Sequence, residues 1–207
     1  MRSTTKPMGV SDSYWSSLTD EYRAMYEIVR PMARATYEVD IQLGYVEKFL
    51  EGQRRDVESM GGVMELDPDF QRGHKWDATQ RTRYIESLIR GCAPRNILFN
   101  CPGYTTGKEP GDIPEHTFQC IDGLQRITTV RKFMAGEFCV FENLKAADLK
   151  GSPFDPSKYR LRIAVYEFSK RADLLQFYID LNAGGTAHSE EEIERVRKLR
   201  DAAAAAS

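Results

Sequence analysis

An acid, an amide and a guanidinium lie within five consecutive positions of this chain, as Asp122, Gln125 and Arg126. The surrounding segment, 118–130, predicts a short strand that ends at Asp122, a turn on Gly123 and a helix that follows directly. A helix start presents unpaired backbone N–H groups and the positive end of the helix dipole, which suit phosphate, and a neighbouring carboxylate suits a metal ion. This segment is therefore a candidate nucleotide site.

Two other polar clusters follow the ends of expected regular elements, where rigid scaffolds usually hold functional side chains. The first comprises Gln71, Arg72, His74 and Lys75, and the second comprises Asn182 with Gly184 and Gly185. An Asp-Gly turn, a lone histidine and a charged segment each have a structural interpretation as well. No single cluster therefore identifies a function, and the elements that position the clusters matter.

Apolar periodicity predicts these elements. Helical spacing is found over 12–34, 43–51, 77–90, 124–135, 171–181 and 189–199, with Gly52 expected to end the second helix. Two helices begin with a capping box, Asp77 with Gln80 and Ser189 with Glu192. Strands are expected over 63–66, 94–99, 118–122 and 159–168, with weak alternation over 37–41 and an edge hairpin at 138–141. Because strands and helices alternate only loosely, without an internal repeat, we expect a compact α+β fold.

A chain of 207 residues suits one substantial domain with an extension. We expect a partly helical N-terminal extension over 1–36, one domain over 37–201 and a tail over 202–207. The extension has apolar residues at helical spacing: Tyr14, Leu18, Tyr22, Met25 and Val29. Such a stripe favours a helix packed on the core, and a partner-binding helix is the alternative.

The formal net charge of −2 gives no overall attraction to nucleic acid, so contact with DNA would need a local basic face. A basic surplus exists over 72–95, where six Lys or Arg residues accompany two acids. The six are Arg72, Lys75, Arg81, Arg83, Arg90 and Arg95. This segment is either a solvated helix face or a surface for a nucleic-acid backbone, with Lys75, Arg81 and Arg83 as candidate DNA contacts.

The cysteines and the apolar segments indicate the cellular environment. Cys92, Cys101, Cys120 and Cys139 include no Cys-x-x-Cys pair and no histidine at metal-ligand spacing, which favours reduced thiols. The N-terminus lacks an apolar signal core, and no segment approaches the roughly 20 apolar residues of a membrane span. We expect a soluble cytoplasmic protein without a membrane partner.

Four motifs, in order, carry a family resemblance. They are Phe70-Gln71-Arg72 with Trp76, Ile85-Glu86-Ser87-Leu88 before Gly91, Asp122-Gly123-Leu124-Gln125-Arg126-Ile127-Thr128-Thr129, and Phe177 through Leu181-Asn182-Ala183-Gly184-Gly185-Thr186. Over 39–199 the chain resembles the DGQQR-motif family, the N-terminal domains of GmrSD-type modification-dependent restriction enzymes and their phage relatives. The resemblance implies the ParB/sulfiredoxin-like fold.

The resemblance also implies a function in the cytoplasm of a bacterial or phage-infected cell. Such a domain binds a nucleoside triphosphate, usually with Mg²⁺, and acts on or senses DNA, including modified DNA. The reaction implied is either NTP hydrolysis or phosphoryl transfer, as in a DNA-base or small-molecule kinase.

Motif matching assigns roles to individual residues. Asp122 matches the motif acid, for metal binding or general-base catalysis, and Arg126 matches a phosphate-binding arginine. Glu86 is the alternative base in the kinase interpretation. The residues expected to bind the nucleotide or its phosphates are Gln71, Arg72, Gly123, Gln125, Arg126, Thr128 and Asn182.

Departures from the family pattern leave alternatives open. Leu124 stands where the motif has its first glutamine, so either a ligand contact is lost or a core contact is improved. Gly73 and His74 stand where a proline and an aromatic residue commonly follow the upstream motif. With three histidines, the chain is not expected to be an HNH nuclease. The alternative from another class is a non-catalytic adaptor or inhibitor whose N-terminal helix binds a protein partner.

Overall fold

A computed structural model of the chain describes residues 6–7, 10–71, 75–105, 107, 110–183 and 190–206. The strands are β1 (Tyr37–Gln42), β2 (Val63–Glu65), β3 (Asn96–Asn100), β4 (Thr117–Asp122) and β5 (Arg160–Tyr166). The α-helices are α1 (Asp12–Ser17), α2 (Asp20–Val29), α3 (Val46–Ser59), α4 (Ala78–Ile89), α5 (Leu124–Met134), α6 (Ala146–Leu149), α7 (Arg171–Ala183) and α8 (Glu190–Ala206). Short 3₁₀ helices cover Leu43–Tyr45, Asp69–Gln71 and Pro156–Lys158.

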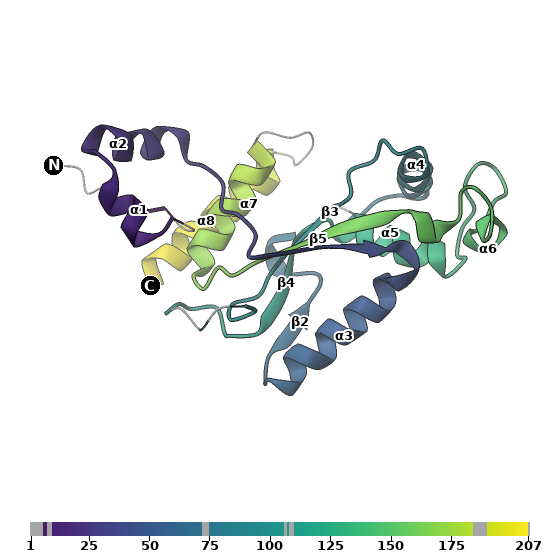
Figure 1. Ribbon diagram of the computed structural model, residues 1–207, viewed down its shortest axis with the longest axis horizontal. Coiled ribbons are helices and arrows are strands. Elements are labelled where there is room, and N and C mark those ends of the chain that lie inside the picture. The colour runs from purple at the N-terminus through teal and green to yellow at the C-terminus, as the bar shows by residue number, and fades with distance from the viewer. Residues whose placement is uncertain are drawn as a thin grey trace.

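Among the described residues, five strands form one mixed sheet in the order β1-β5-β3-β4-β2 (Figure 1). The β1–β5 and β3–β4 pairs are antiparallel, whereas β5–β3 and β4–β2 are parallel. β4, which leads into the candidate site, therefore lies between β3 and the short edge strand β2. The expected α+β class is confirmed, and the ParB/sulfiredoxin-like fold stays a prediction.

Alternate residues of the strands point to opposite faces of the sheet, and each face has its own core. Ile163 of β5 and Cys120 of β4 belong to a larger cluster that includes residues of α3, α4 and α5. The neighbouring Ala164 and Ile121 belong to a second cluster formed with α7 and α8. The sheet is therefore covered on both faces, and the turn after β4 lies where α5 begins.

The N-terminal extension forms two short helices instead of one covering helix. Ser11 and Thr19 cap α1 and α2 by accepting backbone N–H groups. The rings of Trp15 and Tyr26 meet edge to face at 5.4 Å, and Arg23 donates a hydrogen bond to the Trp15 carbonyl at 3.2 Å. Within the described chain neither helix contains a buried residue. The expectation that this extension packs on the core is therefore wrong for α1 and α2.

This hairpin of α1 and α2 presents an apolar groove of about 470 Å³, lined by Tyr14, Leu18, Tyr22, Met25, Tyr26, Val29 and Pro31. The helical spacing that predicted a buried face is present, yet Tyr22 is 54% and Val29 70% exposed. Among the described residues of the extension, Ala33 and Ala35 pack against the second core cluster. Figure 1 shows the hairpin at the opposite end of the molecule from α4, α5 and α6.

Two element boundaries differ from the sequence predictions. α3 continues through Gly52 to Ser59, because burial of Val57 in the larger core cluster offsets the cost of about 1 kcal/mol of a glycine within a helix. The expected hairpin at 138–141 is reduced to one bridge between Val140 and Leu144. The predicted capping serine of α8, Ser189, lies outside the described residues.

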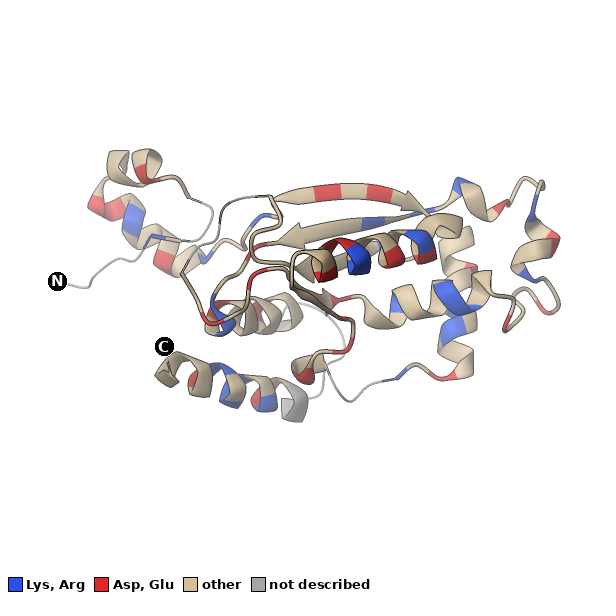
Figure 2. Ribbon diagram, turned by 90° about the horizontal axis from the view of Figure 1, so that it is seen from below, with Lys and Arg blue, Asp and Glu red and all other residues tan. Residues whose placement is uncertain are grey.

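Charged residues of both signs are distributed along the helices (Figure 2), in keeping with the net charge of −2. None of the described helices is both long enough and apolar enough to cross a membrane. Binding of a charged ligand would therefore depend on local groups, such as those of the Asp122–Arg126 segment.

Candidate functional site

Gly123 turns the chain from β4 into α5 directly after Asp122. Its φ of 96° is a left-handed conformation that favours glycine. The turn lies against β3, because a Cβ on Gly123 would be 2.7 Å from Cδ1 of Ile97 and 3.1 Å from the carbonyl oxygen of Asn96. As a glycine, the N-cap residue Gly123 offers no side chain to the first N–H groups of α5. The predicted strand, turn and helix are confirmed, and anion binding at this helix start stays a prediction.

Asp122 and Arg126 form an ion pair across the first turn of α5. Their side chains are 30% and 16% exposed, respectively, so both reach the surface from a mostly buried position. The guanidinium has five N–H donors in a planar fork, which can serve a carboxylate and a phosphate oxygen together. The structure thus places the predicted acid and arginine side by side, and their roles stay predictions.

Two glutamines join the loop before α4 to this segment. Nε2 of Gln71 donates a hydrogen bond to the carbonyl of Ile121, and Oε1 of Gln125 accepts the backbone N–H of Trp76 at 3.0 Å. The partners are 50 and 49 positions apart in the sequence, so the fold brings the cluster that contains Gln71 to the Asp122–Arg126 segment. Arg72 and His74 of the first cluster lie outside the described residues.

Two titratable side chains close to the ion pair are held neutral. Burial raises the pKa of Tyr84 to about 12, although the positive charge of Arg126 opposes the shift. Burial, together with the charge of Asp122, raises the pKa of the Cys120 thiol. The ring of Tyr84 lies 5.1 Å from that of Trp76. Because both groups stay protonated near neutral pH, we expect neither to act as a base or nucleophile.

The remaining motif residues of α5 divide between core and surface. Leu124 packs against the larger core cluster. This contact favours the interpretation that leucine at the motif's first glutamine position serves packing. Thr128 is half-buried and Thr129 is buried, so Thr128 is the better placed of the two to reach a ligand.

Asn182 lies on α7 and bonds to Tyr178, which packs on Phe70 beside Gln71. Its Nδ2 donates a hydrogen bond of 2.7 Å to the carbonyl of Tyr178, one turn earlier in α7. The Tyr178 ring packs edge to face on Phe70 at 5.4 Å, so α7 supports the loop that carries Gln71. Among the described residues, no hydrogen bond joins Asn182 to Asp122. Gly184 and Gly185 lie outside the described residues.

Two arginines that the sequence did not single out hold the 3₁₀ helix before this loop. Arg171 of α7 makes two hydrogen bonds of 2.7 Å to the carboxylate of Asp69. Arg195 of α8 donates to the carbonyls of Asp69 and Phe70 at 2.8 and 3.0 Å. In the sequence each of them is an arginine within a helical pattern, and that pattern does not reveal a distant hydrogen-bond partner. These contacts hold Asp69 and Phe70 in place, directly before Gln71.

The candidate DNA contacts at the start of α4 differ in their availability. Lys75 and Arg83 are exposed. Arg81 is half-buried and its guanidinium donates to the carbonyl of Trp76, so it also holds the loop. Lys75 and Arg83 are therefore the better placed of the three for an external phosphate backbone.

Glu86 is the predicted alternative base, and the structure shows it bound to backbone. Its Oε1 accepts the N–H of Phe141 at 2.7 Å. Phe141 and Glu142 have φ values of 45° and 74°, so this carboxylate anchors a turn in left-handed conformation. The ring of Phe141 also lies 5.1 Å from the guanidinium of Arg90. This arrangement favours a structural role.

A substitution pair separates the two roles of Glu86. We expect Glu86→Ala to lower the free energy of unfolding by about 1–3 kcal/mol, because the Phe141 N–H loses its acceptor. Glu86→Gln keeps an acceptor oxygen and should leave both stability and NTP turnover close to those of the native chain. Urea unfolding and a phosphate-release assay would check this. Loss of turnover in a stable Glu86→Gln protein would instead support the general base.

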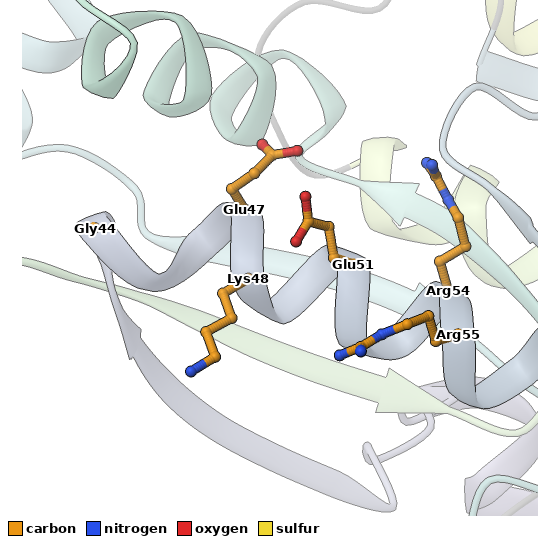
Figure 3. A pocket seen from close by; sticks show the side chains of 6 residues that line it. All are labelled: Gly44, Glu47, Lys48, Glu51, Arg54 and Arg55. Atoms are coloured by element: carbon orange, nitrogen blue, oxygen red, sulfur yellow. The ribbon is translucent and has the colours of Figure 1, made fainter.

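A second hollow, of about 640 Å³, lies beside α3. It is lined by Gly44, Glu47, Lys48, Glu51, Arg54 and Arg55 (Figure 3). Glu47 and Glu51 point to the same side, and Glu47 makes two hydrogen bonds of 2.5 and 2.7 Å to Arg131 of α5. Because acids and bases alternate along one helix, the hollow has the character of a solvated helix face.

Asp122 is the predicted metal ligand, and in the structure its carboxylate is paired with Arg126. Within the described ranges, no group of three or more His, Cys, Asp or Glu residues could hold a metal ion. Mg²⁺ commonly binds through one or two carboxylates, with nucleotide phosphates and waters completing its shell. Asp122 could supply one carboxylate of such a shell, and Mg²⁺ binding there stays a prediction.

Comparison with known proteins identifies one family. The family described as "GmrSD restriction endonuclease, N-terminal domain" matches residues 46–197. The match begins with α3, runs into α8 and includes both segments joined by Gln71 and Gln125. No curated protein and no solved structure gives a match.

Proposed function

The chain belongs to the family of GmrSD restriction endonuclease N-terminal domains, and on this premise we propose that it binds a nucleoside triphosphate at the Gly123 turn, within a system that restricts modified DNA. The observation that carries the proposal is the Asp122–Arg126 pair at the start of α5, where the N-cap residue is Gly123. The helix start attracts phosphate through backbone N–H groups, and the guanidinium adds charge-assisted hydrogen bonds.

The residues of the turn support phosphate chemistry in defined roles. Arg126 would hold the terminal phosphate and stabilise the charge that develops on its oxygens. Asp122 and the nucleotide phosphates would hold Mg²⁺, which neutralises phosphate charge when bound. Alternatively, Asp122 would act as the general base and accept the proton of the attacking group. That group is water in NTP hydrolysis, or a hydroxyl of a DNA base or small molecule in a kinase.

Assays with each NTP would test this function. The full chain, with and without Mg²⁺, should bind at least one NTP by calorimetry. Labelled γ-phosphate should appear as free phosphate in hydrolysis, or on DNA or another acceptor in phosphoryl transfer. Unmodified and base-modified DNA should be compared as cofactors of the reaction. If no NTP binds under any of these conditions, the proposed function is wrong.

A DNA partner predicts a salt-dependent effect at the start of α4. We expect Lys75→Ala and Arg83→Ala each to weaken binding to all DNA sequences alike and to lower the salt slope by about one unit. Arg197→Ala is a matched control, because Arg197 is also exposed but lies on α8, which packs in the second core cluster with α7. Fluorescence anisotropy across a salt series would measure this. Equal losses in all three variants would argue against a DNA face at α4.

The adaptor alternative is favoured by the apolar groove of the α1–α2 hairpin. In that function the groove would hold an apolar helix of a protein partner, since its tyrosines and methionine are residue types enriched at interfaces. The two functions predict different results in a phage restriction assay. Tyr22→Asp should abolish restriction for an adaptor, whereas Arg126→Ala should abolish it for a nucleotide-dependent protein.

A further inference from the structure

Gln71 and Gln125 make hydrogen bonds of opposite polarity at the two ends of the loop 71–76. Gln71 donates from Nε2 to the carbonyl of Ile121, the residue before Asp122. Gln125 accepts at Oε1 from the backbone N–H of Trp76, at 3.0 Å. The amide orientation is fixed in both cases, because a carbonyl requires a donor and a backbone N–H requires an acceptor.

The sheet leaves the Ile121 carbonyl in an irregular position. The β3–β4 register passes from Phe99 opposite Cys120 to Leu98 opposite Asp122, so Ile121 lies in a bulge. Bulges disrupt the ladder locally and often lie next to functional sites. Ile121 is buried, so its carbonyl requires a partner from within the protein. Gln71 supplies it.

The other end of the loop is secured around Trp76. Its N–H is bound by Gln125, its carbonyl accepts from Arg81, and its ring lies 5.1 Å from that of Tyr84. The loop thus meets the Asp122–Arg126 segment on both sides of the Gly123 turn. Its first end meets the strand, and its last end meets the helix.

We infer that Gln71 and Gln125 are positioning residues, which tie Gln71 to Ile121 of β4 and Trp76 to α5, and leave the ligand contacts to Asp122, Arg126 and the Gly123 turn. The effect on nucleotide affinity rests on the proposed function, whereas the two tethers do not. This division of roles also accounts for Leu124, because a motif glutamine can be replaced where its position serves packing.

The opposite polarities give opposite responses to the same substitution. Gln125→Glu keeps an acceptor for the Trp76 N–H and should preserve the tether, whereas Gln125→Met keeps the length and removes the acceptor. Gln71→Glu replaces the donor by a carboxylate that meets the Ile121 carbonyl, so it should be at least as damaging as Gln71→Met. Glutamate is therefore the milder change at 125 and the harsher one at 71.

Fluorescence of Trp76 reports whether the hydrogen bonds of Gln71 and Gln125 are formed, and it needs no ligand. The chain has two tryptophans, so Trp15→Phe leaves Trp76 as the single reporter. In that background we expect Gln125→Met and Gln71→Glu to shift the Trp76 emission to the red and to raise acrylamide quenching about twofold or more. Gln125→Glu should match the parent protein. Far-UV circular dichroism confirms folding, and the Gln125 pair decides the question if a Gln71 variant does not fold.

Nucleotide titration completes the test. We expect Gln125→Met to weaken NTP binding about tenfold, the usual size of one lost hydrogen bond, and Gln125→Glu to weaken it less. Unchanged Trp76 emission in Gln125→Met would overturn the inference. So would loss of NTP binding in Gln125→Glu with a native Trp76 signal, because it would mean that Gln125 contacts phosphate directly. If the parent protein binds no NTP, the proposed function is wrong. The fluorescence measurement still tests whether the two glutamines hold their partners.

Discussion

Replacing Arg126 by alanine should lower kcat/KM for NTP turnover by at least about 100-fold, the size seen when one preorganised donor to a transition-state oxyanion is removed. Arg126 lies in the first turn of α5, and its side chain is 16% exposed. A lysine keeps the charge but loses the planar fork, so Arg126→Lys should recover only part of the activity. Steady-state assays of the full chain with Mg²⁺ and each NTP would measure both.

Stability should respond far less than activity. Removing Arg126 leaves Asp122 unpaired, but its side chain is 30% exposed and can be hydrated. Arg131→Ala is the matched control on the same helix, because Arg131 pairs with Glu47 at the surface beside the second hollow. We expect the control to retain full turnover. Equal activity of the two variants would mean that Arg126 is not part of the site. Circular dichroism would show whether the Arg126→Ala protein is misfolded.

Asp122→Asn tests the other half of the pair. Asparagine keeps the size and the hydrogen-bonding oxygen but loses the charge that Mg²⁺ requires. We expect NTP turnover to fall as far as in Arg126→Ala, with a higher Mg²⁺ concentration needed for half-maximal nucleotide binding. A variant with native Mg²⁺ dependence would place the metal elsewhere.

The sequence predicted the local geometry of the site well, because that geometry depends on neighbouring residues. A strand that ends in Asp122, a glycine at a left-handed φ and a helix whose inner face includes Ile127 are all consequences of short-range patterns. The capping box of Asp77 with Gln80 is present for the same reason. The resemblance also assigned Gln71 and Gln125 to one nucleotide site, and the structure brings Gln71 into contact with Ile121 of β4.

The partners of individual side chains could not be predicted, because they depend on the sheet order. Glu86 has the appearance of a free acid in the sequence, yet the fold places the N–H of Phe141 2.7 Å from it. Arg195 reaches the Asp69 carbonyl across 126 positions. The amphipathic pattern of α2 was recognised, but periodicity states only that a face is apolar and not what covers it.

Gly123→Ala should cause the largest loss of stability, about 2–5 kcal/mol. A left-handed φ of 96° costs a non-glycine residue about 1–2 kcal/mol. In addition, the new Cβ would lie 2.7 Å from Cδ1 of Ile97 and 3.1 Å from the Asn96 carbonyl oxygen and the Ile97 Cα. Two of these atoms belong to the backbone of a central strand and cannot rotate away, so overpacking adds about 1–3 kcal/mol.

Gly136→Ala separates the two costs, because Gly136 follows the other end of α5 with a similar φ of 75° and open space around its Cβ position. It should lose only the conformational cost, about 1–2 kcal/mol. Urea unfolding of both variants would give the difference, which measures how closely the turn approaches β3. Gly123→Ala should also change the position of Asp122 relative to Arg126 and reduce NTP binding, whereas Gly136→Ala should not. Equal stability losses would mean that the turn can move away from Ile97, and the site would then be less rigid than its contacts indicate.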